Sequence, residues 1–434
     1  MAQAFLPVCS VILKLPSMAR IFPFQAYRYS RQAGALENLV TQPYDKITPA
    51  MQARYLELSP SNAVRIILGP RRASDSATGN AYTRAREYLH EWIQNGILER
   101  DPAPSLFAYF QEFPVPETEG RAVRQGFIGL GAVEDYSEGV VHRHEQTLAG
   151  PKQDRLELLR LARAHLGHIF MLYPDPRGEI DALLAEASQS QPLASVTDEY
   201  QATHRLWRVA EPDRVARIQQ LMAEKKLLIA DGHHRYETAL AFRNEHPELA
   251  DAHKVMMTFV NLHSPGLRIL ATHRLVQGLA DFTVEGFLRR AAEVSFQVRP
   301  VGSVAALREA WAQEHAGQVR IGAAFHGSES IYLLETARPE GELDLKVLHQ
   351  KLIREALGIS DEAVREERNL RYMRGLEAAL EEVQRGAAQI AFLVQPTPIE
   401  QIARIAFAGG VMPQKSTDFY PKLLSGLTIY RLER

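Results

Sequence analysis

The chain has 434 residues, of which 46% are hydrophobic and 24% are charged, and its formal net charge is −2. These proportions are ordinary for a soluble globular protein, and the length predicts two or three domains with ample core. A nearly neutral charge argues against a nucleic-acid-binding protein. The single cysteine, Cys9, excludes a disulfide framework and a thiolate metal site, and it favours a reducing cytoplasm.

No run of about 18 apolar residues occurs, so we expect no membrane-spanning helix. The start of the chain contains a short apolar stretch, 5–13, which lacks a basic flank and is interrupted by Pro7. Met18 opens a segment that reads like a natural start. We interpret residues 1–17 as an N-terminal extension rather than a secretion signal, and either Met1 or Met18 could be the true start.

The first domain, 18–139, mixes helix and strand. Apolar residues at helical spacing predict a helix over 78–95. Two apolar runs, 105–113 and 126–133, predict an antiparallel pair of strands joined by the charged loop 114–120.

The central domain, 140–276, is predicted to carry an amphipathic helix over 154–166 and a strand over 169–173. Residues 175–198 read as an inserted loop and helix. Further strands are expected at 227–230, 254–262 and 267–271. After residue 276 helical patterns alternate with short apolar runs, which predicts a C-terminal α+β domain over 277–434 that closes on a Pro-rich loop, 412–422. The fold class is therefore α+β (mixed α/β).

The turn after the strand 227–230 carries the strongest functional signal. The strand stops at Asp231 and Gly232, and a helical pattern then opens with His233, His234 and Arg235. Unpaired N–H groups and the helix dipole make such a helix start a good phosphate site. Asp231 alone could be a helix cap. The run of Gly, two His and Arg beyond it favours a ligand site.

This turn could bind one class of metal ion. Adjacent histidines on a turn point apart, and neither an HExxH motif nor a cysteine partner is present, so a zinc site is not indicated. A hard cation such as Mg²⁺, held between Asp231 and substrate phosphate, suits the carboxylate better.

Other segments also gather polar residues in a short space. The segment 42–46 includes Lys46, and the segment 142–147 includes His144, Glu145 and Thr147. The segment 415–417 is Lys415, Ser416 and Thr417. With the Asp231 turn these make four segments, and a weaker fifth segment, 272–274, follows a strand. Lys415, Ser416 and Thr417 could clamp a phosphate. Glu145 is either an ordinary surface carboxylate or a general base that takes the proton of a substrate hydroxyl.

Common nucleotide and hydrolase motifs are missing from the chain. GxxxxGK[ST] and GxGxxG do not occur, so a P-loop or Rossmann site has no support, and no GxSxG marks a hydrolase triad.

The order of the motifs resembles the ParB/sulfiredoxin-like fold and its branch of free-serine kinases. The likeness covers roughly 140–245 and rests on His-Glu-x-Thr at 144–147 and Asp-Gly-His-His-Arg at 231–235. The whole chain, with Met-Pro-x-Lys-Ser-Thr at 412–417, is also similar to a prokaryotic family of unknown function. The interval between Glu145 and Asp231 is longer than in the compact kinases, and flanking domains are added. A histidine stands where sulfiredoxins carry their cysteine, which excludes sulfinyl reduction.

The resemblance implies a ParB/sulfiredoxin-like central core and specific residue roles. Glu145 would be the catalytic base, Asp231 would lie near phosphates and metal, and Gly232 to Arg235 would line the phosphate pocket. We therefore expect a cytoplasmic small-molecule kinase with Mg²⁺ that transfers a phosphoryl group from ATP, ADP or pyrophosphate, with free L-serine as the best single acceptor. The two alternatives are a ParB-like nucleotide-binding or DNA-associated regulator and a phosphatase that acts on a small phosphorylated metabolite. A homodimer is compatible with the sequence.

Overall fold

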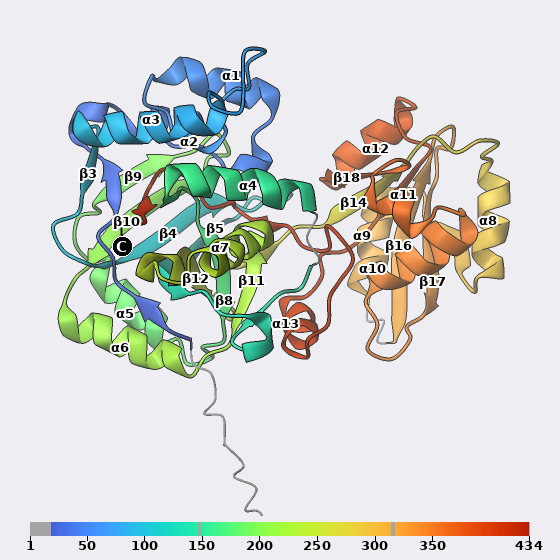
Figure 1. The fold of residues 1–434 in the computed structure, drawn as a ribbon. Helices are drawn as coiled ribbons and strands as arrows, with labels where there is room; N and C mark the ends of the chain where they lie inside the picture. The colour runs from blue at the N-terminus through green and yellow to red at the C-terminus, as the bar shows by residue number, and fades with distance from the viewer. Residues whose placement is uncertain (1–18, 146–148, 314–316, 434) are drawn as a thin grey trace, which may run out of the picture.

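The computed structural model describes residues 19–145, 149–313 and 317–433. The N-terminal extension, 1–17, and the candidate residue Thr147 lie outside these ranges. The described chain forms a large lobe and a small lobe, and the small lobe lies to one side of the large one (Figure 1). Within these ranges no helix is both long enough and apolar enough to cross a membrane.

The large lobe is built on a mixed sheet that has nine strands in the described part of the chain. β6 runs parallel to β11, and β8 runs parallel to β12, whereas the other neighbours are antiparallel. In spatial order the strands are β6 (Val141–His142), β11 (Leu227–Asp231), β8 (Ile169–Tyr173), β12 (Lys254–Asn261), β5 (Arg121–Ala132), β4 (Leu106–Pro114), β10 (Thr203–Val209) and β9 (Ala194–Thr197), with β1 (Ile21–Phe22) beside β5.

Both faces of this sheet are covered, because its strands carry apolar side chains on both sides. α5 (Glu179–Ala187) and α6 (Pro212–Ala223) pack on one face. α4 (Ala149–Ala162) and α13 (Ile399–Phe407) pack on the other, and α7 (His233–Glu245) contributes to both cores. The N-terminal helices lie outside α4, and they are α1 (Pro49–Leu58), α2 (Val64–Ile67) and α3 (Ala81–Gln94).

The small lobe has three layers around an antiparallel sheet, which has six strands in the residues that the structure describes. In spatial order they are β15 (Gln297–Pro300), β17 (Ile331–Ala337), β16 (Gln318–Phe325), β19 (Ile390–Leu393), β14 (Thr272–Val276) and β18 (Leu370–Arg374). One face is covered by α8 (Val284–Glu293), α10 (Asp344–Val347) and the π-helix Leu348–Ala356, beside α11 (Asp361–Arg365). α9 (Val304–Ala312) and α12 (Leu376–Gln384) cover the opposite face.

The chain crosses between the lobes twice. It enters the small lobe after β13 (Arg268–Ile269) and leaves it after β19. The last segment then returns to the large lobe, where β20 (Phe419–Tyr420) pairs with β13 and β21 (Tyr430–Arg431) pairs with β7 (Ala164–His165). This packing differs from the expected C-terminal domain 277–434, and we propose a small lobe of residues 272–394.

Most predicted elements of the large lobe are confirmed. The antiparallel pair β4 and β5, the strand β8, and the unit of β11 followed by α7 appear where the apolar patterns placed them. Residues 175–198 differ from the expected loop and helix, because they also contain β9, which extends the sheet beyond β10. The α+β class that the sequence predicts is confirmed.

Candidate functional site

The turn between β11 and α7 is built around Asp231 and Gly232. Gly232 has a left-handed backbone with φ of 94°, and a Cβ atom there would lie 3.0 Å from Nε of Arg235, so a larger residue would be strained. Arg235 folds back one helical turn and donates from Nη2 to Oδ2 of Asp231 at 2.6 Å. Its other terminal nitrogen donates to the carbonyl of His168. The guanidinium therefore locks the turn.

The second oxygen of Asp231 is held by a lysine from the returning C-terminal segment. Nζ of Lys422 lies 3.1 Å from Oδ1 of Asp231 and 3.2 Å from Oδ1 of Asp418. Burial alone would lower the pKa of Lys422, but the carboxylates of Asp231 and Asp418 raise it. Burial alone would raise the pKa of Asp231, but Lys422 and Arg235 hold it well below its usual range. Asp231 and Lys422 are therefore both charged at neutral pH.

His144 connects three parts of the chain that the sequence marked separately. Its Nδ1 donates to the carbonyl of Ile229 at 2.8 Å, and its Nε2 lies 2.8 Å from the hydroxyl of Thr417. Burial lowers the pKa of His144 to about 4, so the ring is neutral and Nε2 accepts from Thr417. The ring of His233 meets that of His144 edge to face at 4.7 Å. Burial, together with His144, also lowers the pKa of His233, so both rings lack charge at neutral pH.

Glu145, the residue after His144, also contacts the C-terminal loop. It forms a parallel bridge with Met412, whose N–H donates to the carbonyl of His144 at 2.8 Å. Oε1 of Glu145 is shielded from solvent and has no hydrogen-bond partner among the described residues. Burial raises the pKa of Glu145 from 4.5 to about 7, and Lys415 opposes this rise. A carboxylate with such a pKa can take up and release a proton near neutrality.

The loop that contains Lys415, Ser416 and Thr417 is held from the small lobe. Arg274 of β14 is fully buried, and its Nη2 approaches the carbonyls of Gln414 and Lys415 at 3.4 and 3.2 Å. The Ser416 hydroxyl donates to the carbonyl of Pro413 at 2.6 Å, so this hydroxyl serves the loop itself.

An open cleft with a volume of about 770 Å³ lies where the lobes meet. Lys46 and Lys415 line it and form no ion pair with any residue in the described ranges, and Lys422 lines it as well. Burial lowers the pKa of Lys46, with help from Lys422. The cleft also receives aromatic and basic side chains from both lobes, namely Tyr200, Arg371, Tyr372, Arg374 and Tyr420. Glu367 and Asp418 also line the cleft, and carboxylates pair with Arg371, Arg374 and Lys422. The excess of cations, with Lys46 and Lys415 outside these pairs, suits an anionic ligand.

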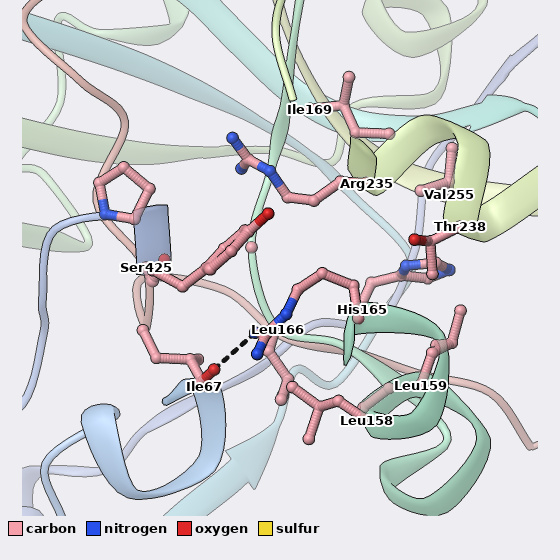
Figure 2. A pocket seen from close by; sticks show the side chains of 15 residues that line it. Ile67, Leu158, Leu159, His165, Leu166, Ile169, Arg235, Thr238, Val255 and Ser425 are labelled. Carbon is pink, nitrogen blue, oxygen red and sulfur yellow. Dashed lines mark hydrogen bonds between the residues drawn. The ribbon is translucent and has the colours of Figure 1, made fainter. Parts of the chain in front are cut away.

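A second, smaller pocket of about 70 Å³ lies behind the Asp231 turn. Figure 2 shows Arg235 extending from α7 into this pocket, with Leu158 and Leu159 on one side of it and Ile169 on the other. Arg155 stacks on the ring of Tyr44 at 4.2 Å and donates to the carbonyl of Ile67 at 2.6 Å. The predicted segment 42–46 thus lies beside the turn on this side.

The described residues do not form a ready-made metal site. No group of three His, Cys, Asp or Glu side chains converges among them. Asp231, the expected Mg²⁺ ligand, already has one oxygen on Lys422 and the other on Arg235.

The structure brings together most of the residues that the sequence selected. His144, Glu145, Asp231, His233 and Thr417 meet around the turn and the C-terminal loop. His234 is half-buried nearby, where burial lowers its pKa and the charges of Glu237, Asp45 and Lys415 act on it.

The sequence did not single out Lys422 or Asp418. Their spacing of four residues within the predicted loop 412–422 was the available signal. Arg274, part of the weaker fifth segment, is central to the site.

The fold and the site describe a mixed α/β protein with a cleft between two lobes. Comparison with known proteins identifies its family. The chain belongs to the family described as protein of unknown function (DUF1015), which matches residues 21–355. No curated protein matches the chain.

Similar solved structures include three proteins at low identity. A conserved hypothetical protein from Pyrococcus furiosus is 14% identical with a TM-score of 0.34, over 64% of this chain and 87% of that chain. A free serine kinase in complex with AMP is 13% identical with a TM-score of 0.34, over 64% and 83%. SbnI from Staphylococcus aureus, with a C-terminal truncation, is 10% identical with a TM-score of 0.35, over 69% and 85%. These values describe a distant likeness.

Proposed function

We propose that the chain is a small-molecule kinase that moves a phosphoryl group from a nucleotide or pyrophosphate to a hydroxyl. The observation that carries this proposal is the position of Glu145, a carboxylate with a pKa of about 7 on which the charges of Lys415 and Lys422 act, two lysines that line the cleft. Phosphoryl transfer depends mainly on positioning and on neutralising phosphate charge, and it gains from a base near the acceptor hydroxyl.

The proposed reaction uses groups of this chain at each step. Oε1 of Glu145 takes the proton of the acceptor hydroxyl while the acceptor oxygen bonds to the terminal phosphorus of the donor. The bond from that phosphorus to the bridging oxygen of the donor breaks, and the bridging oxygen keeps the electron pair. Lys415 and Lys422 stabilise the charge that develops there.

Asp231 has a supporting role in this proposal. It keeps Lys422 charged and in place, since burial alone would favour the neutral amine. Mg²⁺ would enter on the phosphates of the donor, because this ion commonly binds substrate phosphates with few protein ligands. L-serine remains the best single acceptor because of the sequence resemblance, and the small-molecule partners of the protein are this acceptor and the donor.

Phosphorus NMR tests the proposal directly. The full chain is mixed with ATP, ADP or pyrophosphate, with Mg²⁺, and with a panel of amino acids and polyols. We expect a phosphomonoester signal that depends on the acceptor. Glu145→Gln should lower turnover by about a hundredfold or more and keep donor binding. Glu211→Gln, on the surface before α6, is the matched control and should leave turnover unchanged.

Two outcomes would overturn the proposal. One is the absence of any phosphomonoester across the panel in a folded protein. The other is equal turnover in Glu145→Gln and the unmodified chain. Release of inorganic phosphate from phosphorylated metabolites, with no transfer to a hydroxyl, would favour a phosphatase that uses water as the acceptor.

A further inference from the structure

The loop 412–417 is held by one side chain of the small lobe and by one on the segment that returns from it. Arg274 lies two residues after the start of β14, and its Nη2 reaches the carbonyls of Gln414 and Lys415. Thr397 lies on the returning crossing, and its hydroxyl approaches the carbonyl of Ser416 at 3.4 Å. Three successive carbonyls of the loop therefore meet groups whose positions depend on the small lobe.

The same loop determines the surroundings of Glu145. Met412 pairs with the backbone of Glu145, and the N–H of Ser416 donates to its carboxylate. Thr417 donates to His144, the preceding residue. A displacement of the loop would therefore change the hydrogen bonds and the charges that the Glu145 carboxylate experiences.

Arg274 is chemically unusual for a buried arginine. Its side chain is fully buried, and it forms no ion pair with a carboxylate in the described ranges. Its guanidinium lies 5.4 Å from the centre of the Tyr372 ring, and its Nε has no hydrogen-bond partner among the described residues. Buried charges are normally paired, because desolvation is costly. Its compensation comes from the hydrogen bond of Nη1 to the carbonyl of Thr272, from the bonds of Nη2 to the loop carbonyls, and from the charges of Tyr372 and Glu145.

Several charged or titratable groups act on Glu145 from the elements packed around it. Lys415 acts from the loop, where the backbone N–H of Ser416 also donates to the carboxylate; Lys422 acts from the C-terminal segment and Asp231 from the end of β11. Arg274 and Tyr372 act from the small lobe, and each responds to the charge of Glu145. Arg274 is the group in this set that also bonds to the loop from the other lobe.

We propose that Arg274 is a positioning residue that couples the placement of the small lobe to the loop 412–417 and, through it, to the Glu145 carboxylate. This inference goes beyond the proposed kinase function and rests on it only where turnover is measured. When the lobes separate, Arg274 and Thr397 withdraw from the loop carbonyls, and the loop loosens around Glu145. When the lobes close, these contacts order the loop around Glu145.

Three variants of the full chain separate charge from positioning. Arg274→Met removes the charge and the bonds to the loop, Arg274→Lys keeps the charge and loses the paired contacts, and Thr397→Val removes only one hydroxyl. Arg299→Met, at an exposed arginine of the small-lobe strand β15, is the matched control. Two readouts are taken: deuterium exchange in peptides covering residues 411–422, and the pH profile of turnover.

We expect faster exchange of the loop in Arg274→Met and Arg274→Lys, and a smaller increase in Thr397→Val. The acidic limb of the turnover profile should move to higher pH by about half a unit or more in Arg274→Met, because a positive charge near Glu145 is lost, and it should stay in place in Arg274→Lys. Unchanged exchange in Arg274→Met would overturn the proposal, as would an unmoved limb in an active Arg274→Met protein. If no variant or parent protein transfers phosphate, the proposed function fails, and the exchange data alone decide this inference.

Discussion

Nζ of Lys422 lies 3.1 Å from a carboxylate oxygen of Asp231, although 191 positions separate the two residues in the chain. The contact joins the strongest motif of the sequence to a loop near the C-terminus. Asp418 shares the same ammonium group at 3.2 Å. The chain therefore passes through the small lobe and returns before this charge cluster is complete.

The first prediction concerns removal of that shared ammonium. Lys422→Met should destabilise the protein by about 3 kcal/mol, because it leaves Asp231 and Asp418 with one cation fewer in a buried place. Lys46→Met is the control, since Lys46 lines the same cleft and forms no ion pair with a described residue, and it should change stability by at most about 0.5 kcal/mol. Urea unfolding at pH 7 measures both. Equal losses in the two variants would contradict the role of Lys422 as the neutralising partner.

The second prediction concerns the ligand rather than the fold. Lys46→Met should weaken the binding of ATP, ADP or pyrophosphate by about tenfold, since a charge-assisted contact is worth roughly 1.5 kcal/mol. It should also lessen the salt dependence of binding, because one cation is missing from the cleft. Titration calorimetry at two salt concentrations provides the measurement. Lys226→Met, at an exposed position before β11, should bind like the parent chain, and a matching loss there would point to a nonspecific charge effect.

Local sequence patterns were sufficient to predict those strands whose own residues are apolar throughout. The four apolar residues before Asp231 predicted β11, and the buried run Ile169–Tyr173 predicted β8, because a strand covered on both faces needs a continuous apolar sequence. The strand β9 was missed because one of its four residues is buried and it lies at the edge of the sheet. Its pairing with β10 is a tertiary event with little local signal.

The sequence predicted several residues of the candidate site but not the contacts that bring them together. Glu145, Asp231 and Lys415 were selected by residue type and by their places beside strands and turns. Lys422 was not, and Arg274 stood only in the weaker segment 272–274, since the importance of both comes from contacts between segments far apart in the chain. No local pattern states that a fully buried arginine will hold a loop 141 positions away.

The third prediction links Glu145 to stability. Its pKa is raised by burial from 4.5 to about 7, so the folded state binds this proton more tightly than the unfolded state does. The stability that this group contributes is present below about pH 4.5 and is lost as the pH rises through 7. Glu145→Gln, which carries no charge at any pH, should therefore become more stable than the parent chain as the pH rises from 5 to 8.

The size of this effect has an upper bound. The shift corresponds to ~3 kcal/mol at most, and partial exposure of Glu145 reduces it. Thermal unfolding of both proteins across this pH range measures the difference. A constant gap between the two melting temperatures would contradict the raised pKa, and Glu211→Gln should show such a constant gap because it is exposed.

The fourth prediction concerns a contact that joins the lobes away from the cleft. Glu117, in the turn between β4 and β5, accepts from the N–H of Leu376 at 3.2 Å, and its other oxygen lies 2.9 Å from Arg308. A carboxylate at the start of α12 is stabilised by the helix dipole. This contact forms part of the wall of a cavity of about 680 Å³ between the lobes.

Glu117→Gln should loosen the lobes with little effect on global stability, because an exposed ion pair contributes about 1 kcal/mol or less. We expect faster deuterium exchange at the two crossings, 270–272 and 394–397, and an unchanged urea midpoint to within that amount. Glu119→Gln lies in the same turn, forms no ion pair with a described residue, and should leave the exchange unaltered. If Glu117→Gln instead left both crossings as protected as in the parent chain, the closed arrangement would depend on Arg274 and the loop carbonyls rather than on this outer contact.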